Sequence, residues 1–406
     1  MTTHNSSKTP TKITKHDSRT NSGDKQLPTL RGLQFWLYAT NILSPYLPVY
    51  FSAKGYTSSQ IGTMMMLGPL LAVLFQPFWG YLSDKLGTVK KIIAGLWAMS
   101  ILSSIGLFQS SSYGSALFFA TAVYFFWLPT LPLMDSITIK ATEKRGVTYG
   151  SIRLFGSMGY MTILIGTGLL FGSFIGIGNL SYLFWALWIP ALLLLFRLRD
   201  EPTEGERMTL KSLKPILANK SFLWFLLLVF IMSVPHRMHD VMFSLYLQNA
   251  GGSEALVGYS WALHALFEIP AFALLNKYLH KVRELTLLGI VCLLYTLRWT
   301  GYALAPEPWV MVLLQAGAIV TYAVFWLTAV YYTVRVLPKQ LISTGQSLLS
   351  MVYLGLAGMT GGTVGGWLFD HFGATSIYWF AAAASLVAGC AFLATEFVAQ
   401  RRTFRR

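Results

Sequence analysis

The chain has 406 residues, of which 54% are hydrophobic and only 12% are charged, and its mean hydropathy is +0.53. Soluble domains carry about a quarter charged residues, so this composition excludes an ordinary soluble protein and indicates a polytopic membrane protein. The formal net charge of +15 requires no nucleic-acid partner, because Lys and Arg concentrate in the tails and in alternate loops.

This alternation of positive charge follows the positive-inside rule and predicts a cell-membrane protein with both termini in the cytoplasm. Residues 1–30 are polar and lack the apolar core of a signal peptide, so we interpret them as a disordered cytoplasmic tail. The two cysteines, Cys292 and Cys390, both fall in apolar segments. They indicate neither a disulfide framework nor a metal motif.

Twelve apolar segments, each about long enough to span hydrocarbon, predict an all-α membrane protein with twelve transmembrane helices. The expected helices are 31–52, 60–83, 90–109, 114–139, 149–173, 180–197, 221–248, 255–277, 285–304, 309–333, 344–370 and 375–398. The expected domains are an N-terminal six-helix bundle at 31–198, a charged cytoplasmic linker at 199–219, a C-terminal bundle at 220–400 and a basic tail at 401–406.

The two halves repeat each other. A shift of 196 residues (246 − 50) places Tyr50 on Tyr246, and the same shift places Gly55 on Gly251. Repeated halves favour a transporter that rocks one bundle against the other around a central site.

A short polar hairpin follows the second apolar segment. In it, Gly80 allows a close helix approach, Gly87 allows a turn, Lys85 is a cytoplasmic anchor, and Asp84 can pair with a helix N-terminus. Its pattern G-x-x-x-D-K-x-G-x-x-K-K resembles the signature of the major facilitator superfamily. The resemblance implies two pseudo-symmetric six-helix bundles.

The same resemblance implies a conformational latch at the cytoplasmic side. Asp84 is expected to reach the start of the eleventh helix when the protein is open outward. At that start, Ser343 and Gln346 have the spacing of a capping box. We therefore expect Gly80, Asp84, Lys85, Gly87, Ser343 and Gln346 to form the latch.

Asp135, Arg153, Glu268 and Arg298 are ionisable residues that fall inside the predicted helices. An ion in hydrocarbon costs at least about 2.5–3.5 kcal/mol, so each needs a partner or a water-filled cavity. Folding the hairpins predicts one acid–arginine pair in each half, lining a shared central cavity. The alternative for Glu268 and Arg298 is a permanent buried pair that only fixes helix register.

The stretch from Tyr149 to Tyr160, YGSIRLFGSMGY, resembles the start of helix 5 in the lactose permease family and in related phenylpropionate and nucleoside permeases. The resemblance implies that Arg153 binds solute together with Asp135. Trp261 and Tyr322 lie well inside helices and are expected to offer faces on which a ring can stack.

Proton coupling is less directly indicated. The family's helix 10 carries ionisable coupling residues, whereas residues 315–322 here offer only a tyrosine. Glu268 is the first candidate carrier, with His264 one helical turn before it. His236 and Asp240 in the seventh helix are expected to form an outer gate or a proton entry path. A metal site there is the weaker alternative, since a fourth ligand is missing.

We expect a secondary transporter of a small polar organic solute (a sugar, a nucleoside or an aromatic acid) that works by alternating access and proton symport. We further expect a monomer in the lipid bilayer, without cofactor, metal or nucleic acid. An efflux transporter and a non-transporting solute sensor remain alternatives. A membrane enzyme is disfavoured, because the sequence shows no nucleophile–base pair of convincing spacing.

Overall fold

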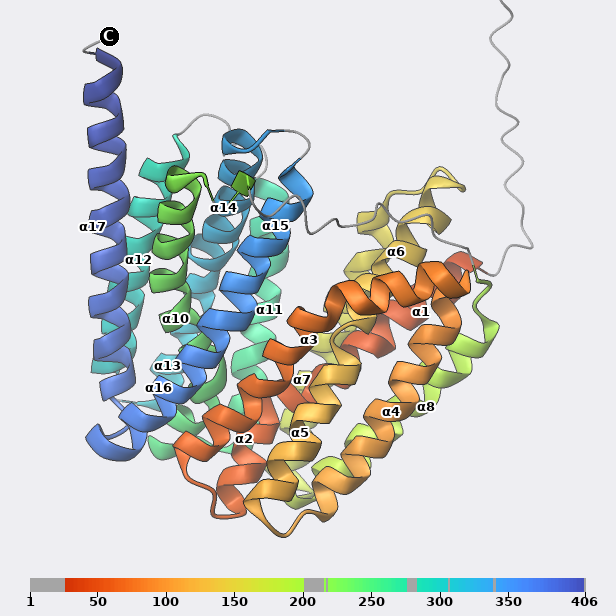
Figure 1. Ribbon diagram of the computed structural model, residues 1–406. Helices are drawn as coiled ribbons and strands as arrows, with labels where there is room; N and C mark the ends of the chain where they lie inside the picture. Colours follow the sequence, from red (N-terminus) through yellow and green to blue (C-terminus); the bar gives the residue numbers. More distant parts are fainter. Residues whose placement is uncertain are drawn as a thin grey trace, which may run out of the picture.

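The computed structural model shows an all-helical protein (Figure 1). It describes residues 26–200, 215–216, 218–275, 283–305, 307–338 and 341–404, and for residues 173, 268–275, 343 and 402–404 the backbone alone. The N-terminal half contains α1 (Gln26–Ala39), α2 (Leu43–Ala53), α3 (Ser58–Leu86), α4 (Val89–Gln109), α5 (Tyr113–Trp127), α6 (Thr130–Glu143), α7 (Tyr149–Ser173) and α8 (Leu180–Arg197). The C-terminal half contains α10 (Lys220–Asn249), α11 (Glu254–Leu275), α12 (Glu284–Leu304), α13 (Pro308–Leu314), α14 (Tyr322–Val336), α15 (Ile342–Ser350), α16 (Ala357–Phe372) and α17 (Ser376–Phe404).

These described elements group into the twelve expected helical segments, ten of which are long and apolar enough to cross a membrane, and the predicted boundaries agree with them to within six residues. Four crossings are interrupted. The first changes to a 3-10 turn, η1 (Thr40–Ile42), and the fourth breaks between α5 and α6. The tenth contains a 3-10 segment, η5 (Gln315–Val320), and the eleventh contains a π-helical segment, η7 (Met351–Leu356). Non-helical backbone at membrane depth is tolerated where protein or a water-filled cavity surrounds it.

The two halves meet at one end of the molecule and stand apart at the other (Figure 1). The helices that touch across the boundary are α3 with α16, α7 with α11, and α2 with α10. Glycine allows this approach. A Cβ at Gly62 would lie 2.0 Å from the carbonyl oxygen of Gly362, and a Cβ at Gly366 would lie 2.3 Å from that of Ser58. We call this the closed end.

The predicted repeat is visible in the geometry. Gly55 and Gly251 have φ values of +85° and +89°, and each ends the first crossing of its half. The hydroxyl of Tyr246 donates to the carbonyl of Tyr302 at 2.8 Å, and that of Tyr50 donates to the carbonyl of Phe108 at 3.5 Å. Equivalent residues therefore fix equivalent helix contacts in the two halves.

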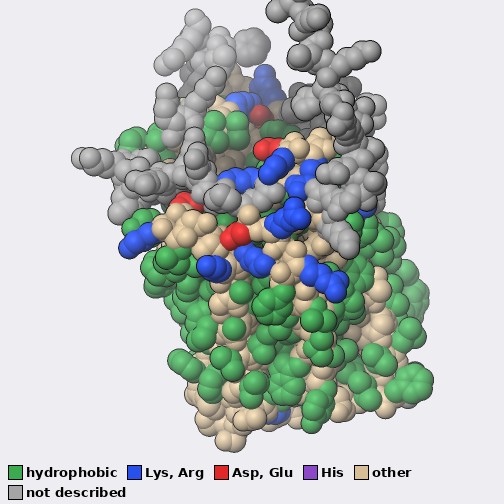
Figure 2. Space-filling view, turned by 90° about the vertical axis from the view of Figure 1, so that its right-hand side faces the viewer, with side chains coloured by type: hydrophobic (Ala, Val, Ile, Leu, Met, Phe, Trp, Pro, Cys, Tyr) green, Lys and Arg blue, Asp and Glu red, His purple; other side chains and the backbone are tan. Residues whose placement is uncertain are grey.

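Positive charge marks the other end. Figure 2 shows Lys and Arg side chains gathered at one end of the molecule, next to a broad apolar belt. The end of α3 contributes Lys85, the start of α4 contributes Lys90 and Lys91, and the α6–α7 connection contributes Lys144 and Arg145. We call this the basic end; it lies opposite the closed end.

Candidate functional site

A cavity of about 840 Å³ lies between the two halves. Its aromatic lining consists of Tyr38, Tyr124, Trp127, Tyr160, Trp261, Tyr322 and Tyr353. Its polar lining consists of Asn41, Ser44, Gln76, His236, Arg237, Asp240, His264, Gln346, Ser347 and Ser350. Both halves thus contribute to one hollow, as expected for a solute site at a repeat interface.

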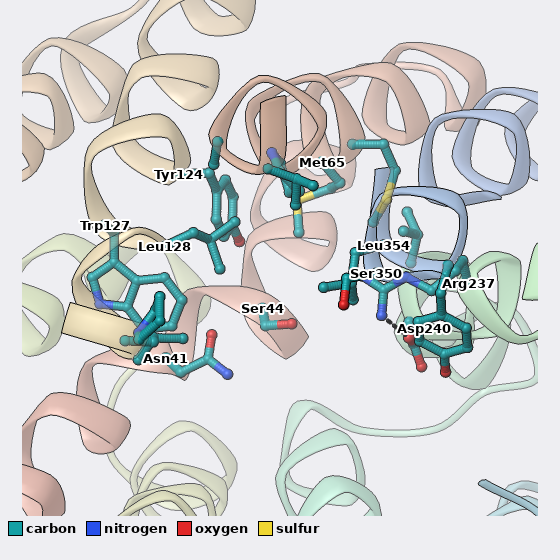
Figure 3. Close-up of a pocket in the computed structure, with 18 of the residues that line it drawn as sticks. Asn41, Ser44, Met65, Tyr124, Trp127, Leu128, Arg237, Asp240, Ser350 and Leu354 are labelled. Atoms are coloured by element: carbon teal, nitrogen blue, oxygen red, sulfur yellow. Dashed lines mark hydrogen bonds and ion pairs between the residues drawn. The ribbon is translucent and has the colours of Figure 1, made fainter. Parts of the chain in front are cut away.

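The wall from the N-terminal half is mostly apolar and includes four aromatic side chains, those of Tyr38, Tyr124, Trp127 and Tyr160. Figure 3 shows Tyr124 and Trp127 on the side of the cavity opposite Arg237 and Asp240. The indole Nε1 of Trp127 donates to Oγ1 of Thr40 at 3.0 Å. This bond joins the break in the first crossing to the break in the fourth, so the two interruptions hold Trp127 in place.

The wall from the C-terminal half carries charge on α10. Nη1 of Arg237 lies 2.6 Å from Oδ2 of Asp240, and Nε2 of His236 lies 3.8 Å from the same oxygen. Residues three and four apart share a helix face, so all three side chains reach one patch of the cavity. The expectation of an outer gate is corrected, because these residues line the central cavity itself. Within the described residues, no group of three His, Cys, Asp or Glu could hold a metal ion.

His236 is held by aromatic neighbours. Its ring stacks on Tyr322 with centroids 5.0 Å apart and an interplanar angle of 3°, and its Nδ1 lies 3.2 Å from the hydroxyl of Tyr295. His239 lies outside the lining and makes a 3.0 Å contact from Nδ1 to the hydroxyl of Tyr378. Of the two histidines on α10, His236 is therefore the one that lines the cavity.

Two predicted residues on α11 also face the cavity. The indole of Trp261 donates to Oγ of Ser244 at 3.1 Å, and Nδ1 of His264 lies 3.2 Å from Oε1 of Gln315. Tyr322 joins them in the lining. The Glu268 side chain, one turn farther along α11, lies outside the described residues.

Arg298 lies behind this wall and is only 6% exposed. Its Nε donates to the carbonyl of Leu314 at 3.2 Å, Nη1 donates to Oγ1 of Thr321 at 3.1 Å, and Nη2 donates to Oε1 of Gln315 at 3.0 Å. These acceptors flank or belong to η5. The expectation that Arg298 lines the cavity is wrong, since it reaches the lining through Gln315 and His264.

Asp135 and Arg153 are brought together as predicted, with an electrostatic interaction between them, but neither belongs to the cavity lining. The amide of Gln34 donates to Oδ1 of Asp135 at 3.3 Å. The guanidinium of Arg153 lies 3.9 Å from the ring centroid of Tyr38, which does line the cavity. The Asp135–Arg153 pair therefore contacts the cavity wall through Tyr38. The expectation that these two residues line the cavity themselves is corrected.

The residues of α3 that were expected to form the latch lie at the basic end. Gly87 ends α3 with φ +61°, as the turn required, but a Cβ at Gly80 would meet nothing within 4 Å. Asp84 and Lys85 are exposed at the basic end. There the two halves stand apart, so the close approach expected at Gly80 is not made.

The expectation of a capping box at the start of the eleventh helix is also corrected. α15 begins at Ile342 after Leu341, without a side-chain cap, and the amide of Gln346 donates to the carbonyl of Val330 at 3.0 Å. The Ser343 side chain lies outside the described residues. Gln346 lines the cavity instead.

Several lining residues were not identified from sequence, among them Asn41, Gln76, Arg237 and Ser350. One group of these lining residues could have been found from a pattern in the sequence. The lining residues Gln346, Ser350 and Tyr353 recur at helical spacing, which is a polar face within an otherwise apolar segment.

The chain is similar to known transporters and permeases. Residues 27–380 match the model of the MFS_1 like family. The chain is 28% identical over 353 residues to the uncharacterized transporter YwbF of Bacillus subtilis, covering 85% of this chain and 87% of that one. It is 27% identical over 356 residues to the maltose permease of Geobacillus stearothermophilus, covering 86% and 89%.

Two further matches bear on the branch and the fold. A probable 3-phenylpropionic acid transporter of Escherichia coli is 25% identical over 369 residues, covering 87% of this chain and 93% of that one. The crystal structure of the D323A mutant of nucleoside transporter NupG superposes with a TM-score of 0.82 at 17% identity, covering 91% and 98%. The predicted facilitator fold and its resemblance to these permeases are confirmed.

Proposed function

The chain belongs to the MFS_1 like family of membrane transporters, and from this premise we propose that it moves a small polar organic solute by alternating access with proton symport. Family membership makes it a multi-pass secondary transporter of a small organic solute rather than an enzyme. The solute class, the direction of transport and the coupling belong to the proposal.

The observation that carries the proposal is the cavity shared by both halves. Its volume of about 840 Å³ falls in the range of small-molecule sites. The aromatic side chains of Tyr124 and Trp127 face an ion pair across it. This arrangement suits a solute with a flat or apolar face and polar groups opposite, which a sugar, a nucleoside or an aromatic acid each provides.

We assign the basic end to the cytoplasm by the positive-inside rule. Along α3, the contact of Gly62 with α16 at the closed end gives way to cavity lining from Met65 to Pro77, toward the basic end. In this assignment the structure is the inward-open state. The closed end is then the outer gate.

A ligand screen tests the solute site. Purified protein should gain thermal stability with at least one of maltose, uridine or 3-phenylpropionate. Arg237→Ala should abolish the response by removing the donor in the cavity, and Arg153→Ala should weaken it by releasing Tyr38. Glu307→Gln removes an exposed acid on the α12–α13 connection and should respond as wild type. Retention of the full response in both arginine variants would overturn the assignment.

For coupling we propose Asp240 as the proton carrier, with Glu268 as the alternative. Asp240 lines the cavity beside Arg237 and His236, so a proton or a solute can compete for its carboxylate. In proteoliposomes with a trapped pH dye, solute uptake should acidify the lumen. Asp240→Asn should retain solute exchange while losing this acidification. If Glu268→Gln alone loses it, the carrier is Glu268.

A further inference from the structure

Asp370, near the end of α16, bonds to the first turn of α3 in the other half. Its Oδ1 accepts from the backbone N–H of Ser58 at 2.9 Å, and its Oδ2 accepts from the backbone N–H of Ser59 at 2.8 Å. The hydroxyl of Ser59 donates to the same Oδ2 at 2.6 Å. One carboxylate thus makes three hydrogen bonds across the closed end.

These bonds complete the start of α3. The first N–H groups of a helix have no partner within the helix. Thr57 and Gln60 satisfy two of them reciprocally, because the Thr57 side chain accepts from Gln60 N and the Gln60 side chain accepts from Thr57 N. The remaining N–H groups, those of Ser58 and Ser59, point to Asp370. Negative charge is also favoured there by the helix dipole.

The contact is available in only one state of a rocking transporter. It sits beside the closest backbone approaches between the halves, where a Cβ at Gly366 would lie 2.3 Å from Ser58 O. Any motion that opens the closed end separates α16 from the start of α3. The three bonds to Asp370 must then break together.

We propose that Asp370 is a positioning residue of the transport cycle, a latch that holds the closed end shut until solute movement requires it to open. The latch belongs to one side of the molecule. The shift of 196 residues places Phe174 opposite Asp370, so the α7–α11 contact of the repeat lacks the equivalent carboxylate. Release of Asp370 from Ser58 and Ser59 then biases the equilibrium toward opening between α3 and α16.

The test measures the width of the closed end without any solute, so its failure is independent of the solute assignment. Cys292 and Cys390 are replaced by Ser, and spin labels are attached at the exposed Ser111 and Asn249, one in each half. Double electron–electron resonance then reports the distance between the halves. Asp370→Asn should raise the ratio of long- to short-distance populations at least about threefold, since bonds to a charged group are stronger than neutral ones but surface exposure weakens them.

Matched variants separate a latch from general destabilisation. Ser59→Ala removes a single bond and should shift the distribution in the same direction by less. Asp370→Glu keeps the charge and should restore much of the short-distance population. Glu307→Gln removes an acid on the α12–α13 connection and should leave the distribution unchanged. An unchanged distribution in both Asp370→Asn and Ser59→Ala would overturn the proposal.

Discussion

At the scale of single residues, the ion pair of Arg237 and Asp240 gives the cavity its polar centre. The two side chains are 19% and 18% exposed, and their charged atoms lie 2.6 Å apart. Each ion is largely removed from water, so each depends on the other for compensation. A solute that bonds to one of them changes the balance of the pair.

Arg237→Met should therefore destabilise the protein strongly. Breaking a buried pair costs about 3–5 kcal/mol, because one charge is left uncompensated, whereas replacing both partners by apolar groups is often neutral. The double variant Arg237→Met/Asp240→Leu should recover most of the lost stability without recovering solute binding. Thermal unfolding in detergent measures both. A single variant as stable as wild type would contradict the buried-pair interpretation.

The sequence identified the ionisable residues whose burial in the membrane costs free energy. It did not indicate the direction in which each side chain points. Trp261, His264, Tyr322, His236 and Asp240 do line the cavity. Depth along a helix can be counted from its ends, which is why Trp261, His264 and Tyr322 were expected at the level of the cavity. His236 and Asp240 were expected nearer the outer end instead. The rotation of each helix depends on its packing, so the positions of Asp135, Arg153 and Arg298 outside the lining had no local signal.

At the scale of elements, apolar length made the crossings predictable, and a proline lies at one of their breaks. Pro129 lies at the break between α5 and α6. Proline removes a helical N–H and disfavours continuation of the helix. The break at η5 has another cause. Nε of Arg298, on α12, donates a hydrogen bond to the carbonyl of Leu314, at the end of α13. This contact joins separate helices, so no local sequence pattern reveals it.

The glycine contacts between α3 and α16 lead to a test of the closed end. In Gly62→Ala the new Cβ would lie 2.0 Å from the carbonyl oxygen of Gly362, so the halves must separate. Alanine favours the helix itself by about 1 kcal/mol, so any loss comes from packing. The label pair at Ser111 and Asn249 should report a longer distance.

Gly95→Ala in α4 is the control for this effect, because its Cβ would meet nothing within 4 Å. It should leave the distance distribution unchanged. If Gly62→Ala and Gly95→Ala gave the same distribution, the tight approach of α3 and α16 would not be what keeps this end shut.

At the scale of the whole molecule, the repeat and the charge distribution explain the architecture. The shift that aligns Gly55 with Gly251 also aligns the turns that end the first crossing of each half. Two similar bundles around a shared cavity can open at either end. The apolar segments predicted the bundles, but their pattern does not indicate at which end the two halves are in contact.

We propose that the cavity between the halves is the path of the solute. Uptake of a radiolabelled solute identified in the ligand screen, measured in proteoliposomes, tests it with Ser350→Trp. Ser350 lines the cavity from α15, so an indole there should fill the site and abolish both binding and uptake. Leu193→Trp, at a 60% exposed position on α8, should transport as wild type. Transport by Ser350→Trp at the wild-type rate would contradict the claim.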